Sequence, residues 1–445
     1  MRVLWIAQNG GNYKKGIIKG TGGWIGALQG ELVKRYPDME LGITFESSDY
    51  ESIKEGNVTY FPVRTTDNND FSKGVDRLFH SEKYRLNRLA RGMKEVLDKY
   101  KPDVVHVWGI EVPSAAIIPL IDRPFVVHIQ GLLSLCIFVY LPPSFSKDDL
   151  RRASNYLNPI NWLKRAVGKT AMGSYKAFKR AAERELFYGK YVKNWIGRTD
   201  WDQTASQMLS PESRYFHCEE LIRGDFNGAR WHFHYDGDTV GIHSSLSGPW
   251  YKGIDVVLKT AEVMKRQGVK AEWNIYGVSK DSEVVRYFIR HLGISPENVG
   301  VRFHGHVDGK AIREGLLQSD VYVHPSYIEN SSNAIAEAQM LGVPVIAQFV
   351  GGNPTMLKND SGVLVAPNEP YILASKIMEM RKKIIAEGYS ERALAVASER
   401  QNTEKTCSDL INIYKTIISE SGKLSHRGGV IFLIHSYLYR ERRAA

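Results

Sequence analysis

Two carboxylates, Glu329 and Glu337, stand eight positions apart on either side of a predicted helix start. The segments around them, Val321–His324 and residues 343–347, are short and rich in β-branched residues, as expected of parallel strands buried on both faces. Ligands of an open α/β sheet bind beyond the carboxyl ends of its strands. Glu329 is therefore predicted in a loop at that edge, where its oxygens can accept hydrogen bonds from sugar hydroxyls.

The helix between these strands has recognisable ends. Residues 330–332 are good N-cap residues, residues 334–341 favour helix, and Gly342 followed by Pro344 supplies the stop. The first N–H groups of a helix lack intrahelical acceptors and can bind phosphate, at about 1.5 to 3 kcal/mol for each charge-assisted bond. We therefore predict a diphosphate site at the backbone of four residues, Ser331, Ser332, Asn333 and Ala334.

Glu337 is predicted inside the helix, with its side chain leaning back toward the N-terminus and the ribose of a nucleotide. The glutamate spacing alone also fits two solvated acids. With its strands, helix and Gly-x-Pro-Val ending, however, the segment resembles the E-x7-E signature of the retaining family 4 glycosyltransferases of bacterial polysaccharide or glycolipid type. The resemblance implies the α/β GT-B fold, in which two facing Rossmann-like, doubly wound domains enclose a cleft.

The resemblance also implies the reaction. Members of this family move a sugar from a nucleotide-sugar donor, with a UDP-sugar favoured here, to a hydroxyl of a glycan or lipid-linked glycan, and they retain the anomeric configuration. The donor is a substrate, so no separate cofactor and no metal is predicted. A nucleotide-sugar epimerase or phosphorylase of the same fold, and a non-catalytic nucleotide-binding scaffold at a membrane surface, are the alternatives.

The length of 445 residues is too great for one core and predicts two domains. Strands are predicted in one series at residues 3–7, 41–45, 58–61, 104–107 and 125–128, and in a second at residues 240–243, 272–276, 301–304, 321–324, 345–347 and 363–365. We expect an acceptor-side domain over 1–220, a turn-rich join near 220–238, and a nucleotide-sugar-binding domain over 239–402. By resemblance, the helix predicted at 403–419, and with it the segment 403–445, returns to the first domain.

Lys252 follows a predicted strand and precedes the helix expected over Ile254–Arg266. It matches the lysine of the family's Lys-Gly motif, which implies that it stabilises the departing diphosphate as negative charge develops there. Many members also carry an arginine a few residues earlier, but residues 244–249 hold no cation. Without this pattern, a surface lysine before a helical glycine would be an equally good interpretation of Lys252.

A glycine-rich loop and one amide side chain complete the predicted site in the first domain. Gly22 and Gly23 precede a predicted helix and resemble the family's loop against the donor phosphates, although a glycine cluster is often only a loop. Their spacing does not form the NAD fingerprint G-x-G-x-x-G. Strand alignment puts Gln130 where many members have a sugar-contacting histidine, while His128, two positions earlier, is interpreted mainly as structural.

Asp200 and Asp202 form an Asp-x-Asp pair, which can hold a divalent cation in glycosyltransferases of the other main fold, GT-A. Here the pair follows a short predicted strand that ends before Arg198 and precedes a predicted helix. Thr199 or Asp200 is a suitable N-cap, so a structural or acceptor role is favoured over metal binding. Arg198 is a candidate for the absent second cation. His304, His306 and His324 show no metal-binding spacing.

The net charge of +10 has a local source in residues 151–198, where bases are interleaved with apolar residues such as Trp162 and Phe178. This segment predicts contact with a membrane surface, or equally a solvated basic face. No nucleic-acid-binding module is recognised, so nucleic acid is not predicted as a partner. Three cysteines far apart and no visible signal peptide favour the cytoplasm, at the inner face of the membrane if the basic segment docks there.

Overall fold

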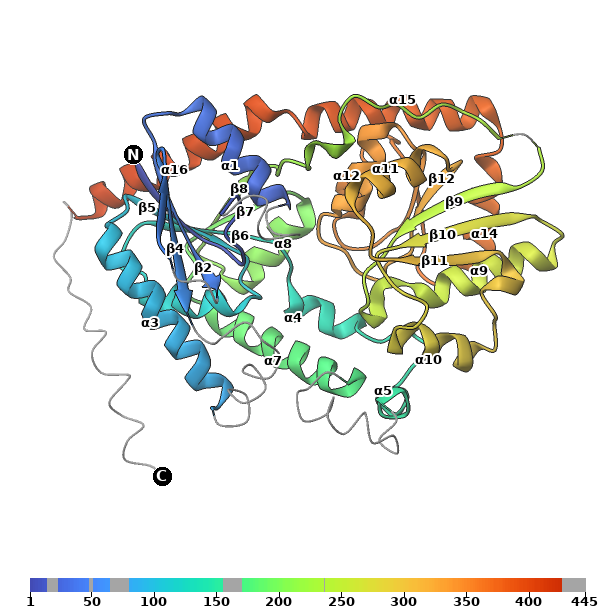
Figure 1. Ribbon diagram of the computed structural model, residues 1–445, viewed down its shortest axis with the longest axis horizontal. Helices are drawn as coiled ribbons and strands as arrows, with labels where there is room; N and C mark the ends of the chain where they lie inside the picture. Colours follow the sequence, from blue (N-terminus) through green and yellow to red (C-terminus); the bar gives the residue numbers. More distant parts are fainter. Residues whose placement is uncertain (14–22, 48–50, 65–79, 155–169, 236, 426–445) are drawn as a thin grey trace.

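The computed structural model describes residues 1–13, 23–47, 51–64, 80–154, 170–235 and 237–425. Its strands form two sheets, each covered by helices on both faces, in two domains that stand side by side (Figure 1). Alternating residues of the first strand show why such strands are buried. Val3 and Trp5 enter the core on one face of the sheet, whereas Leu4 and Ile6 enter the core on the other.

The first sheet has the strand order β3-β4-β2-β1-β5-β6-β7-β8 and is parallel except for the β3–β4 pair. Its strands are β1 Arg2–Ile6, β2 Glu40–Ser47, β3 Ile53–Glu55, β4 Val58–Arg64, β5 Val104–Trp108, β6 Phe125–His128, β7 Asn194–Gly197 and β8 Arg214–His217. The helical elements of this half are α1 Gly23–Arg35, α3 Glu82–Tyr100, η1 Pro113–Leu120, α4 Leu133–Cys136, η2 Ile137–Val139, α5 Lys147–Ser154, α7 Ala171–Gly189 and α8 Asp200–Leu209.

The second sheet has the order β11-β10-β9-β12-β13-β14 and is parallel throughout. Its strands are β9 Val240–Ser245, β10 Ala271–Tyr276, β11 Val301–Gly305, β12 Val321–His324, β13 Val345–Gln348 and β14 Val363–Val365. The helical elements of this half are η3 Gly224–Phe226, η4 Trp250–Lys252, α9 Ile254–Arg266, α10 Glu283–Leu292, η5 Glu297–Val299, α11 Gly309–Leu317, α12 Asn333–Leu341, α13 Asn353–Met356, α14 Pro370–Glu379 and α15 Lys383–Arg400. The last helix, α16 Thr403–Ser425, packs against the first domain.

The chain passes between the domains at two neighbouring places. The first is the segment 218–239 between β8 and β9, and the second is the junction of α15 and α16. They are tied by an ion pair between Glu219 Oε2 and Arg400 Nη2 at 2.8 Å. Helix α16 then lies on the first domain (Figure 1), where Trp5 Nε1 donates to Tyr414 Oη at 3.0 Å.

A third connection, made by side chains, was not expected from the sequence. Tyr140, Phe145 and Leu150, which precede β7, belong to the same core cluster as residues of the second sheet. Phe145 packs edge-on against Phe288 of α10 with ring centroids 4.7 Å apart. The expected boundary at residue 220 therefore does not describe the packing here, because part of the first-domain sequence helps to bury the second domain.

Each of the eleven strands predicted in the two series corresponds to a strand of the structure, with ends that differ by no more than a few residues. The short strand β7 was expected only as the element before Arg198. Strands β3 and β8 were missed. Both lie at the edges of the first sheet, where side chains are largely exposed and the sequence carries no run of apolar residues.

Candidate functional site

A pocket of about 380 Å³ opens between the two domains at the carboxyl ends of their strands. The first domain contributes two side chains, Gln130 after β6 and Arg198 after β7. The second domain contributes the loop after β9, the loop before α12 and the first residues of α12. The lining residues from this domain are Ser245, Leu246, Ser247, Lys252, Tyr276, Gly277, Ile312, His324, Glu329, Ser331, Ser332, Asn333 and Ala334.

Glu329 is the centre of the charged part of this pocket. Its Oε2 lies 2.7 Å from Lys252 Nζ and 2.9 Å from His324 Nε2. Burial opposes ionisation of Glu329, but the Lys252 ammonium and the His324 ring outweigh it and hold the pKa of this carboxyl well below its usual range. An anionic carboxylate beside a fixed amine suits a ligand that combines sugar hydroxyls with phosphate.

Lys252 reaches this position because two backbone segments approach closely behind it. Gly253 has φ +79°, and a Cβ there would lie 2.0 Å from the carbonyl oxygen of Pro325, so only glycine fits. Tyr327 N–H donates to the carbonyl oxygen of Tyr251 at 2.8 Å, which joins the same two segments. The backbone thus brings the loop of Lys252 and the loop of Glu329 together.

The start of α12 forms one wall of the pocket. Ser332 is the N-cap, and its side chain accepts from Ile335 N–H at 3.3 Å. The preceding N–H groups at Asn333 and Ala334 have no acceptor one turn earlier within the helix, so they are suited to an anion. The four residues predicted for the diphosphate, Ser331, Ser332, Asn333 and Ala334, all line the pocket.

Arg198 reaches from the first domain to this helix start. Its Nη1 lies 3.2 Å from Asn333 Oδ1, and its Nη2 lies 3.3 Å from the carbonyl oxygen of Ser331. Behind it, Glu220 Oε2 pairs with Arg198 Nη1 at 2.8 Å. Gln130 Nε2 donates to the other oxygen of Glu220.

Glu337 lies one turn along α12 and is not among the residues that line the pocket. Its Oε1 accepts from Arg223 Nη2 at 3.0 Å. Burial raises the pKa of Glu337 to about 7, against the opposing charge of Arg223. The structure therefore pairs this carboxylate with an arginine of the segment between the domains, a partner that was not anticipated.

The other expected residues lie apart from the pocket. His128 is fully buried in the stacked aromatic cluster with His106 and Trp108. Gly23 begins α1 and does not line the pocket, and Gly22 lies outside the described residues. His324, in contrast, lines the pocket and contacts Glu329; its place as the last residue of β12 was the signal that could have found it.

The Asp-x-Asp pair serves the fold. Thr199 is the N-cap of α8, and its hydroxyl and the Asp202 carboxylate form a capping box. Asp202 Oδ2 also accepts from Arg198 N–H at 2.8 Å, which fixes the backbone that carries the arginine. Among the described residues, no three His, Cys, Asp or Glu side chains are grouped as metal ligands would be.

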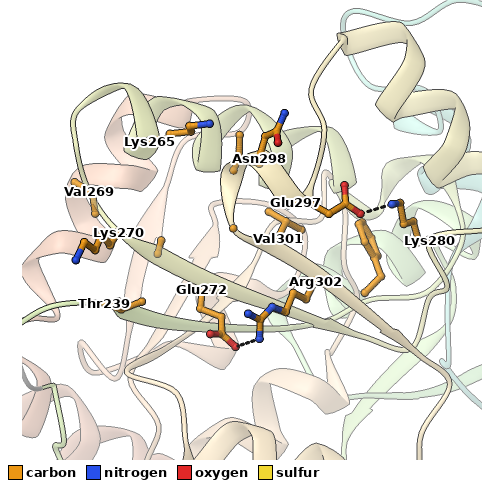
Figure 2. Close-up of a pocket in the computed structure, with 14 residues that line it drawn as sticks. Thr239, Lys265, Val269, Lys270, Glu272, Lys280, Glu297, Asn298, Val301 and Arg302 are labelled. Carbon is orange, nitrogen blue, oxygen red and sulfur yellow. Dashed lines mark hydrogen bonds and ion pairs between the residues drawn. The ribbon is translucent and has the colours of Figure 1, made fainter.

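A larger pocket, of about 690 Å³, lies at the opposite ends of β10 and β11 (Figure 2). Two of its cations are already paired, since Arg302 Nη1 lies 2.9 Å from Glu272 Oε1 and Lys280 pairs with Glu297. Because ligands of such sheets bind at the carboxyl ends of the strands, the smaller pocket between the domains is the better candidate site.

Comparison with solved structures defines the class of fold. Sucrose-phosphate synthase from Thermosynechococcus elongatus superposes with a TM-score of 0.67 at 13% identity, over 94% of this chain and 100% of that chain. HepE of Anabaena, in complex with UDP and glucose, superposes with a TM-score of 0.57 at 16% identity, over 94% of this chain and 100% of that one. The predicted GT-B fold of two Rossmann-like domains is confirmed.

Sequence comparison relates the second domain to one group of glycosyltransferases. The family model described as Glycosyl transferases group 1 matches residues 237–383, the domain that carries Lys252, Glu329 and Glu337. A D-inositol 3-phosphate glycosyltransferase of Geodermatophilus obscurus is 32% identical over 130 residues, which are 28% of this chain and 28% of that protein. The alignments span less than half of the first curated relatives' own lengths.

Proposed function

We propose that this protein is a retaining glycosyltransferase that moves a sugar from a nucleotide-sugar donor, with a UDP-sugar favoured, to a hydroxyl of a glycan or lipid-linked glycan. The observation that carries the proposal is the Lys252–Glu329 ion pair beside the start of α12, in a pocket shared by both domains. The match to group 1 glycosyl transferases supports it. The HepE complex with UDP and glucose shows that this fold accommodates such ligands.

In this proposal, separate groups in and beside the pocket bind the diphosphate, the sugar and the ribose of the donor. The diphosphate binds at the N–H groups of Asn333 and Ala334 and beside Lys252. Glu329 accepts hydrogen bonds from the transferred sugar, and Glu337 exchanges Arg223 for the ribose hydroxyls. Gln130 contacts the sugar from the first domain and, being neutral, cannot act as a general base.

The reaction breaks the bond between the anomeric carbon and the diphosphate oxygen and forms a bond from that carbon to the acceptor oxygen. Negative charge grows on the departing diphosphate, and Lys252 stabilises it more than it stabilises the bound donor. The acceptor proton passes to the departing phosphate, which lies on the same face of the sugar. No metal is required in this proposal, because Lys252 and the helix start supply the positive potential.

We propose further that the acceptor is presented at an anionic membrane surface, at the inner face of the membrane. Helix α7 carries several exposed bases and exposes half of the surface of Phe187 and nearly half of Leu186. Within the described residues, no helix combines the length and apolar character needed to cross a bilayer. Residues 155–169 of the predicted basic segment lie outside the described residues.

Vesicle co-sedimentation tests the surface. The protein should bind vesicles containing anionic phospholipid, and Phe187→Ser should weaken that binding without lowering the melting temperature, because the ring is exposed. Phe349→Ser, which alters an exposed ring in the second domain, is the matched control. Equal binding to neutral and anionic vesicles would contradict recognition of an anionic surface, and binding to neither would remove the membrane from the proposal.

The central experiment is a donor screen followed by a transfer assay. UDP-, GDP- and ADP-sugars are added in turn, and the bound donor should raise the melting temperature. The stabilising donor is then incubated with candidate acceptors, and release of the nucleoside diphosphate and the anomeric configuration of the product are measured. An epimerase would convert the donor without an acceptor, a phosphorylase would use inorganic phosphate, and a scaffold would bind without turnover. A product with inverted configuration would contradict the retaining mechanism.

A further inference from the structure

Glu220 is a buried acid that no sequence motif singled out. It follows β8 in the segment that leads to the second domain, and its side chain is fully buried. Three polar side chains converge on it. Arg198 Nη1 lies 2.8 Å from Oε2, Gln130 donates to Oε1, and His128 Nε2 lies 3.5 Å from Oε1.

The charges within this cluster show which side chain stabilises the Glu220 carboxylate. Burial raises the pKa of Glu220, and Arg198 opposes that rise by favouring the carboxylate. Burial lowers the pKa of His128, so its ring is neutral and adds no charge. A buried carboxylate is retained only with a partner, and that partner here is the Arg198 guanidinium.

The ion-pair partner of Glu220, Arg198, and its hydrogen-bond donor, Gln130, are both pocket residues. Arg198 and Gln130 are the two side chains by which the first domain lines the pocket, and Arg198 and Lys252 are its only cations among the described lining residues. Arg198 also donates across the domain boundary to Asn333 and Ser331. The loop before Lys252 has no cation between Ser244 and Pro249, so positive charge beyond Lys252 has to come from elsewhere.

We infer that Glu220 is a positioning residue for the donor site: it holds Arg198 and Gln130 as one unit, so that the second cation at the diphosphate is supplied by the opposite domain. This inference rests on the proposed transferase function. Arg198 Nη1 contacts both Glu220 and Asn333, and its Nη2 reaches Ser331 before the start of α12, where the diphosphate would lie. Donor binding and contact between the domains are then coupled, because one guanidinium takes part in both.

A double-mutant cycle on kcat and KM tests the inference, with four proteins: wild type, Arg198→Gln, Glu220→Gln and the double variant. Each single variant should lower kcat by about tenfold or more, since a fixed charge at the developing anion is lost or misplaced. The double variant should be no slower than Arg198→Gln, because Glu220 acts through the arginine. Equal effects of Glu220→Gln in both backgrounds would show a merely structural role and overturn the inference.

The double variant and one further variant, Glu219→Gln, keep the test decisive. The double variant has no unpaired buried charge, so it covers the case in which a single variant does not fold; a folded double variant with wild-type kcat overturns the inference. Glu219→Gln breaks the neighbouring ion pair with Arg400, which does not line the pocket, and should lower the melting temperature while kcat stays within about twofold. A comparable loss of kcat in Glu219→Gln would also contradict a specific role for Glu220.

Different experimental results would contradict the positioning role of Glu220 and the proposed transferase function. If wild-type protein binds and turns over no nucleotide sugar, the transferase proposal fails. If wild type transfers sugar, Lys252→Ala abolishes transfer, and Glu220→Gln retains kcat and KM within about twofold of wild type, the transferase proposal stands and the positioning role of Glu220 is wrong.

Discussion

Glu329 shows how one residue can be buried and still charged. Burial disfavours the carboxylate, yet Lys252 at 2.7 Å and His324 at 2.9 Å reverse that preference. Because the folded-state pKa is depressed, this stabilisation is present above the ordinary carboxyl pKa and is lost as the pH falls toward the depressed value. Glu329 therefore stays charged throughout the neutral range.

Lys252→Ala should reduce kcat by about 100- to 1,000-fold, the usual effect of removing one group that stabilises developing charge. The donor should still raise the melting temperature, since the N–H groups of α12 remain. Steady-state kinetics and thermal unfolding with donor measure the two quantities. Lys310→Ala, which changes an exposed lysine on α11 of the same domain, should leave both unchanged.

From the raised pKa of Glu337 we expect donor binding to depend on pH. Its pKa, raised to about 7, means that it loses its charge as the pH falls from about 8 to about 6, and the ribose then loses a carboxylate acceptor. The dissociation constant of a UDP-sugar should increase up to about tenfold over this range, measured by calorimetry. A UDP-sugar is a better ligand than UDP for this measurement, because its diphosphate diester does not change its protonation over this pH range.

Glu337→Gln is the control for this effect. The amide cannot ionise, so its donor affinity should be weak and nearly independent of pH over the same range. A variant that keeps the wild-type pH dependence would assign the titration to another group and remove Glu337 from the ribose site.

At the scale of elements, the site depends on turns that bring loops into contact. The η4 turn that carries Lys252 ends at Gly253, whose positive φ and contact with the Pro325 carbonyl leave no room for a Cβ. The following helix α9 then runs away from the pocket with a buried apolar face. The position of Lys252 therefore follows from backbone packing and not from the lysine itself.

Gly253→Ala should destabilise the protein by more than about 2 kcal/mol and lower kcat, because positive φ and a backbone clash act together. Gly268→Ala is the matched control. Gly268 has a similar φ of +73°, but nothing lies within 4 Å of an added Cβ, so only the conformational cost of about 1 kcal/mol is expected. Urea unfolding measures the stability of both variants. Equal losses of stability would show that the backbone moves to relieve the clash at residue 253.

At the scale of the whole molecule, the two domains are joined by more than their connecting segments. Helix α16 covers the first sheet, and the residues around Phe145 cover part of the second (Figure 1). Phe145 packs against Trp250, two residues before Lys252, with ring centroids 5.6 Å apart. First-domain sequence thus supports the turn that carries the cation of the second domain.

Phe145→Ala should lower the stability of the protein by about 3 kcal/mol, because it removes a buried ring from this joint core. Phe138→Ala is the control, since that ring is 87% exposed and its loss should change stability by no more than about 0.5 kcal/mol. Thermal and urea unfolding measure both. An equal response of the two variants would contradict the packing role of residue 145.

The strands and the local site were predictable because their signals are local. Short β-branched runs predicted β1, β9 and β12, and the cap and stop residues predicted α12 within one residue of its observed start. Lys252, Glu329 and the four residues at the start of α12 lie within one continuous stretch of the second domain, so spacing and resemblance sufficed to select them.

The contacts between residues far apart in the sequence were decided only by the tertiary structure. Arg198 and Gln130 were named from the sequence, but Glu220, which holds both, lies 22 and 90 positions further along the chain and carries no motif. The pairing of Glu337 with Arg223 and the packing of Phe145 on Phe288 are equally long-range. Periodicity and caps report each residue's immediate neighbours along the chain, whereas these partners are distant in the sequence and meet only in the folded structure.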